Sequence, residues 1–83
     1  MTKQTINSLV NITKIGFRRN MSAYPMQMEY LGNVYDFIDT GIHCLVRRGE
    51  SVSEILTLSD GMATFRLRSD NRGNDWTLLS IMA

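Results

Sequence analysis

The stretch MQMEYLGNVYDFI, residues 26–38, carries the strongest fold signal in the sequence. From Met26 to Tyr30, large apolar residues occupy every second position, a period that is typical of a strand with one buried face. Pro25 stands at the start, where a strand can spare its N–H. A Gly-Asn pair at 32–33 then separates two apolar runs, which indicates a hairpin with a two-residue turn. The stretch therefore predicts an antiparallel pair of strands, with Met26, Met28 and Tyr30 facing the core.

Outward from this hairpin, short runs of β-branched, aromatic and aliphatic residues recur, separated by Gly, Asn, Asp or Ser. The runs cover residues 11–19, 26–31, 34–38, 42–47, 55–58, 62–68 and 76–82. Residues 5–10 and 51–58 also carry apolar side chains at helical spacing, so the pattern allows one short helical turn. The sequence predicts an all-β, mainly antiparallel fold of about six to seven short strands, as a small barrel or a strongly curved sheet.

The chain has 83 residues, which is too short for two separate cores. Residues 11–83 are therefore expected to form a single small β domain, preceded by residues 1–10 as a flexible segment or an edge strand. Closing the strands into a barrel would remove the unpaired edges that invite aggregation. Dimerisation through an edge strand would have the same effect.

Composition excludes several function classes. Nine basic and eight acidic residues leave a net charge of +1, which gives no global field to attract a polyanion. One cysteine and one histidine cannot form an internal disulfide or a structural zinc site, and no glycine-rich phosphate motif occurs. We expect no metal and no cofactor. No apolar run resembles a signal peptide or approaches the roughly 20 residues of a membrane span, so a soluble cytoplasmic protein is expected.

The sequence offers no catalytic residues. His43 and Cys44 are adjacent, so on a strand their side chains point to opposite sides and the imidazole cannot activate the thiol. We expect Cys44 to be a small buried hydrophobe and His43 an exposed polar residue. Asp60, Asp70 and Asp75 lie in predicted turns, where aspartate accepts backbone N–H bonds. The protein is therefore predicted not to be an enzyme.

Arginine is the unusual feature of the composition. Six arginines come in close pairs, and arginine is preferred where planar contacts to phosphate or carboxylate matter. Proteins that bind single strands combine such a basic surface with exposed aromatic rings. The candidate residues for binding a nucleic acid or a protein partner are Arg18, Arg19, Arg47, Arg48, Arg66, Arg68, Tyr35 and Trp76.

Two functions follow as alternatives. The first is a non-enzymatic small β-barrel binding module that mediates protein interaction or self-association, through an edge strand or an aromatic patch. The second is weak single-stranded nucleic-acid binding through the paired arginines. All six arginines on one face, without acidic partners, would favour nucleic acid.

Residues 24–35, with their proline-initiated strand, glycine turn and second aromatic-bearing strand, resemble small uncharacterised bacterial β-rich proteins. A terminal tryptophan strand after a polar hairpin, here around Trp76, belongs to the same pattern. The resemblance covers about half of the chain and implies a small β-rich domain, without implying a substrate. In size and strand number the chain is also similar to Src-homology-3-like domains, which is an analogy of fold only.

Overall fold

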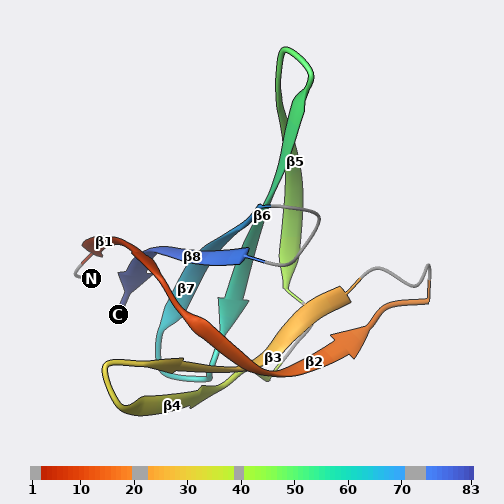
Figure 1. Ribbon diagram of the computed structural model, residues 1–83. Coiled ribbons are helices and arrows are strands. Elements are labelled where there is room, and N and C mark those ends of the chain that lie inside the picture. Colours follow the sequence, from red (N-terminus) through yellow and green to blue (C-terminus); the bar gives the residue numbers. More distant parts are fainter. Residues whose placement is uncertain (1–2, 20–22, 39–40, 71–74) are drawn as a thin grey trace.

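The computed structural model describes residues 3–19, 23–38, 41–70 and 75–83, and this part of the chain contains eight strands and no helix. The strands are β1 (Lys3–Leu9), β2 (Asn11–Phe17), β3 (Ala23–Tyr30), β4 (Asn33–Asp36), β5 (Ile42–Arg48), β6 (Ser51–Ser59), β7 (Thr64–Asp70) and β8 (Asp75–Met82). They form a five-stranded sheet in the order β1-β8-β7-β6-β5 and a three-stranded sheet in the order β2-β3-β4 (Figure 1). Every pairing is antiparallel, so the predicted all-β antiparallel class is confirmed.

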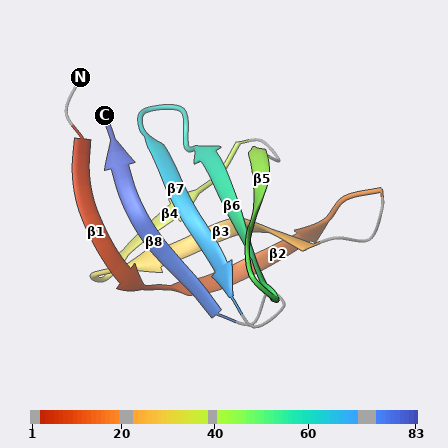
Figure 2. The same cartoon turned by 90° about the horizontal axis from the view of Figure 1, so that it is seen from above.

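The sheets do not close into a barrel, and this part of the prediction is wrong. The chain passes between them at two places, where the Val10 N–H donates to the carbonyl of Trp76 at 3.1 Å and the Ile38 N–H donates to that of Ser59 at 2.9 Å. Both bonds attach the linking segments to strands of the larger sheet, and in the described chain no ladder joins a strand of one sheet to a strand of the other. The strands of the smaller sheet instead run across those of the larger one (Figure 2), as in sandwiches whose corners are made by strands that switch sheets.

Two segments with helical spacing are strands. Residues 51–58 lie in β6, and residues 5–9 lie in β1, which is an edge of the five-stranded sheet. Alternation decides β6, because Leu56 and Leu58 are buried while Thr57 between them and Ile55 before them are partly exposed. β1 makes the eighth strand, one more than the seven apolar runs predicted. Within the described ranges, no helix is long and apolar enough to cross a membrane.

The hydrophobic core lies between the two sheets and is built mainly by the larger one. Its buried hydrophobic residues, among those described, are Met28, Leu56, Leu58, Phe65, Leu67, Trp76 and Leu78. All except Met28 belong to β6, β7 and β8, where the inward positions alternate with outward ones that are mostly polar. Phe65 is at the centre, with its ring centroid 5.1 Å from that of Tyr35 and 5.4 Å from that of Phe37. These two aromatic residues bring the smaller sheet and its exit segment onto the larger one.

The β3–β4 hairpin is present, but its turn lies one residue earlier than predicted. Tyr30 pairs with Asn33, so the two turn residues are Leu31 and Gly32, with φ values of 51° and 79°. Positive φ at both central positions is the geometry that matches the twist of the flanking strands. The turn therefore begins at the end of the apolar run, and Asn33 becomes the first residue of β4.

The predicted apolar face of β3 is interrupted. The register between β2 and β3 shifts on both sides of Lys14, and a shift of this kind moves neighbouring side chains to the other face. Met28 is completely buried and Tyr30 packs against the core, as predicted. Met26, by contrast, is 38% exposed, and Pro25 is buried beside it.

Candidate functional site

The six paired arginines do not share one surface. Arg18 and Arg19 follow β2 in the smaller sheet, and the Arg18 guanidinium lies 5.2 Å from the centroid of the Tyr24 ring. Arg47 and Arg48 are neighbours on β5, so they point to opposite sides of the larger sheet. The structure brings together only Arg48, Arg66 and Arg68, which line hollows on the outer face of the five-stranded sheet. The outer face is here the side turned away from the three-stranded sheet.

The two aromatic candidates are not available for stacking. The Trp76 side chain is 5% exposed and belongs to the core. Tyr35 packs on Phe65 between the sheets, at 5.1 Å between ring centroids. Both side chains lie on inward positions of their strands. Alternation in the sequence does not tell which of the two faces of a strand is the buried one. An arginine surface with these rings as stacking partners is therefore not formed.

Two adjoining hollows on the outer face form what we call the outer-face groove. One has a volume of about 300 Å³ and lies towards β1, and the other has about 340 Å³ and lies towards β5. Ile55 and Leu79 line both hollows, so they form a shared apolar floor. The charged side chains that line the groove are Lys3, Arg48, Arg66, Arg68 and Asp70.

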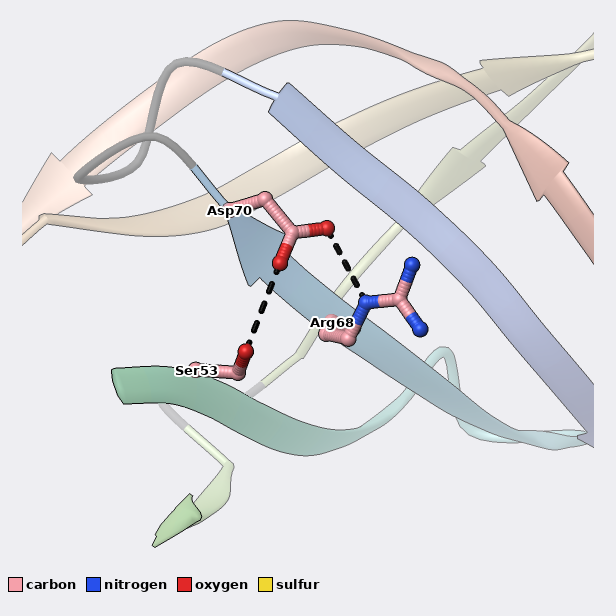
Figure 3. Close-up of polar contacts among 3 residues, drawn as sticks. All are labelled: Ser53, Arg68 and Asp70. Carbon is pink, nitrogen blue, oxygen red and sulfur yellow. Dashed lines mark hydrogen bonds and ion pairs between the residues drawn. The ribbon is translucent and has the colours of Figure 1, made fainter. Parts of the chain in front are cut away.

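Arg68 is held in position within this groove. Its Nε donates to Oδ2 of Asp70 at 3.0 Å, and the other carboxylate oxygen accepts a bond from the Ser53 hydroxyl at 3.4 Å. Both Nη groups of Arg68 point away from the carboxylate (Figure 3). The two partners are 43% and 34% exposed, so solvent screens the pair and it contributes little to stability. Its effect is to orient the guanidinium.

A second candidate surface is the free edge of β5. This strand is the outermost of its sheet, and all seven of its residues are exposed. Its hairpin with β6 projects beyond the two sheets, as Figure 1 shows. The exposed fractions are 77% for Ile42, 64% for Leu45 and 38% for Val46, with 51% for Val52 on β6. These apolar side chains lie on a sheet edge that no neighbouring strand in the described chain covers.

His43 and Cys44 lie on this same strand and face opposite sides. His43 pairs in register with the inward Leu56, and Cys44 with Ile55 on the outer face. The imidazole Nδ1 lies 3.6 Å from Oε2 of Glu54. Cys44 is exposed, and the prediction that it would be buried is wrong because it lies on the outer face of an edge strand, where no described element packs against it.

The aspartates differ in their roles. Asp60 accepts the N–H groups of Met62 and Ala63 through one oxygen, at 2.9 and 2.8 Å, as expected for a turn aspartate. Asp70 and Asp75 are strand residues that pair with each other across β7 and β8 rather than turn residues. Residues 71–74 of this loop lie outside the described residues. In the described part of the chain, no group of three or more potential ligands could hold a metal ion.

Lys3, Ile55, Leu79 and Asp70 were missed as site residues by sequence reasoning. One signal was present at Leu78-Leu79, where two adjacent leucines break the alternation of a strand. The register between β7 and β8 shifts there, which places Leu79 on the outer face beside Ser80. Lys3 gave no signal, because its position depends on the pairing of β1 with β8.

A scan against protein-family models found no match, and searches of curated proteins and of solved structures found no similar chain. The resemblance to small bacterial β-rich proteins therefore stays a prediction.

Proposed function

We propose that this protein is a non-enzymatic interaction module that self-associates, with two copies pairing through the free edge of β5. The observation that carries the proposal is that all seven residues of this edge strand are exposed and that its outer edge has no partner strand among the described residues. In the reducing cytoplasm, where we place the protein, Cys44 stays a thiol and the dimer is held by non-covalent contacts.

The backbone of β5 is suited to adding another strand. It pairs with β6 in one continuous register from Ile42 to Arg48, without a bulge. It contains no proline, and its charged residues Arg47 and Arg48 stand only at the hairpin tip. An unpaired edge of this length is a template for a second chain. Proteins normally protect such an edge with a bulge, a proline or charged side chains along the strand. A closed symmetric dimer is the simplest arrangement that removes it.

The side chains of β5 also favour a second copy. In an antiparallel pair centred on Cys44, Ile42 of each copy would lie opposite Val46 of the other, and His43 opposite Leu45. The apolar side chains would then contact each other across the two chains. Burial contributes about 25 cal/mol per Å² of apolar surface, which matters in a domain whose own core is small.

Charge supports the antiparallel arrangement. The hairpin tip of one copy, with Arg47 and Arg48, would lie beside the base of the other hairpin. The two tips therefore stay apart, at opposite ends of the paired strands, whereas a parallel arrangement would place them side by side.

Sedimentation analysis over about 1 to 200 µM tests the proposal. Cys44→Asp would place two carboxylates opposite each other at the symmetry axis, so we expect the dimer dissociation constant to rise more than about tenfold. Cys44→Ser should leave it nearly unchanged. Val34→Asp adds the same charge to β4, the exposed edge of the smaller sheet, and should also have no effect. A wild-type protein that is monomeric over this whole range contradicts the proposal.

Oxidative cross-linking tests the register. Residues directly opposite in antiparallel strands have Cα atoms about 4.5–5.5 Å apart, within the range of a disulfide. The wild type should therefore form a covalent dimer through Cys44 under mild oxidation. The variant with Cys44→Ser and Val34→Cys carries its only thiol on β4 and should cross-link much more slowly. Equal rates would show that the pairing is not centred on Cys44.

A further inference from the structure

We propose that the outer-face groove binds an extended acidic segment of a partner protein. The groove lies on the face of the five-stranded sheet, whereas pairing of β5 uses its edge. Val46 and Arg48 of β5 belong to both surfaces, but the other residues that line the groove lie on β1, β6, β7 and β8, so this proposal does not depend on self-association.

The charge of the groove defines its ligand. Four cationic side chains, those of Lys3, Arg48, Arg66 and Arg68, line it with the single carboxylate of Asp70 among the described residues. The chain as a whole carries a net charge of only +1, so positive charge is concentrated here. In the described part of the chain, Arg66 forms no ion pair, and Arg68 keeps both Nη groups turned away from Asp70 (Figure 3). Planar guanidinium groups of this kind bind carboxylates in a bidentate manner.

The floor of the groove favours a peptide over a nucleic acid. Ile55 and Leu79 are aliphatic, and no aromatic residue is among the described residues that line the two hollows. Bases of a single strand need aromatic or comparable faces for stacking, which contributes about 1–3 kcal/mol per base. Aliphatic side chains of a peptide would instead contact the floor while its acidic side chains reach the cations on either side.

The dimensions set the length of the segment. The groove crosses the sheet from β1 to β5, which are separated by four strand spacings of about 4.8 Å, or roughly 19 Å. An extended chain covers this distance with about six residues. The segment would lie across the strands and make its contacts through side chains, so it needs no free sheet edge.

Fluorescence anisotropy with a labelled peptide of about eight residues, in which glutamate alternates with leucine, tests the proposal. The double variant Arg66→Glu and Arg68→Glu should weaken binding at least about tenfold and reduce its dependence on salt. The matched control is Lys14→Glu with Arg19→Glu, which makes the same change of net charge on and beside β2 of the smaller sheet, away from the groove. This control should bind within about twofold of the wild type.

Three results would overturn the proposal. The first is no binding of the peptide by the wild type at low salt. The second is an equal loss in both double variants, because binding would then follow net charge rather than the groove. The third is tighter binding of an oligothymidine of matched length and charge, which would identify the groove as a nucleic-acid site. Measuring the same series at protein concentrations at which sedimentation shows only monomer separates this result from self-association, because each single copy carries the whole groove.

Discussion

The two halves of β6 both carry apolar side chains on the inward face, and these side chains have different environments. Leu56 and Leu58, near its end, are 0% and 1% exposed, whereas Val52, near its start, is 51% exposed. The strand is continuous and paired on both sides for part of its length, so the difference does not arise from its backbone. It arises because the smaller sheet covers only the base of the β5–β6 hairpin. Burial in this protein is therefore decided by what covers a strand as well as by its alternation.

The same comparison separates two parts of the molecule. The covered part, formed by β7, β8 and the end of β6, contains most of the core and is stabilised by the chain itself. The uncovered part, formed by β5 and the start of β6, exposes apolar side chains and an unpaired edge. We infer that the first part supplies the stability of the fold and that the second is available for a partner.

Truncating a core ring gives the largest expected effect. Phe65→Ala should lower the free energy of unfolding by about 3–5 kcal/mol, because it removes a fully buried ring that contacts both Tyr35 and Phe37. Val52→Ala, in the uncovered part, should cost less than about 1 kcal/mol. Urea denaturation at one fixed protein concentration measures both. If Phe65→Ala does not fold, Phe65→Leu should show a smaller loss that still exceeds that of Val52→Ala. Similar losses for the two positions would contradict the division into covered and uncovered parts.

Two glycines at opposite ends of the β5–β6 hairpin should give the next largest difference in stability when each is replaced by alanine. Both have positive φ, 73° at Gly41 and 59° at Gly49. A Cβ atom at Gly41 would lie 2.6 Å from the carbonyl oxygen of Thr57, whereas at Gly49 it would meet open space. Gly41→Ala should therefore cost about 2–4 kcal/mol, and Gly49→Ala only the backbone strain of about 1–2 kcal/mol. Thermal unfolding of the two variants compares them directly, and an equal shift in Tm would show that the hairpin base is not tightly packed.

The turns at the two ends of β6 give the smallest difference. Asp60→Ala removes the oxygen that accepts the Met62 and Ala63 N–H groups, and should lower the free energy of unfolding by about 1 kcal/mol. Glu50 lies in the exposed turn at the hairpin tip, and Glu50→Ala should change the free energy of unfolding by less than about 0.5 kcal/mol. The measurement is again urea denaturation. A larger loss at Glu50 than at Asp60 would mean that the tip, rather than the base, anchors the hairpin.

Local sequence was sufficient to predict where the strands lie. It was not sufficient to predict which side chains are buried where the pairing is irregular or a strand is uncovered. Alternation located most strands, and adjacency placed His43 and Cys44 on opposite sides of β5. Alternation failed at Met26, where shifts in the pairing of β2 with β3 change which side chains point inwards. It also failed at Cys44, whose strand is regular but is left uncovered. Both failures come from neighbouring strands rather than from the residue's own segment.

The candidate site was predictable only in part for the same reason. Arg66 and Arg68 are two residues apart on one strand, so their common face follows from the period of two. That Arg48 joins them, while Arg47 and the pair at 18–19 do not, depends on the order of strands in the two sheets. Trp76 and Tyr35 were candidates because their rings could be exposed, and the packing of the smaller sheet buries or covers them instead.

Local sequence is enough to specify the antiparallel β class, the positions of most strands and turns, and the opposite directions of adjacent side chains. These features depend on interactions between residues close together in the chain. The tertiary structure alone decided that the strands form two crossed sheets rather than a barrel, which part of β6 is buried, and that Lys3 and three arginines line one groove. These features depend on contacts between strands that are far apart in the chain. Such contacts leave no pattern in the residues next to one another in the sequence.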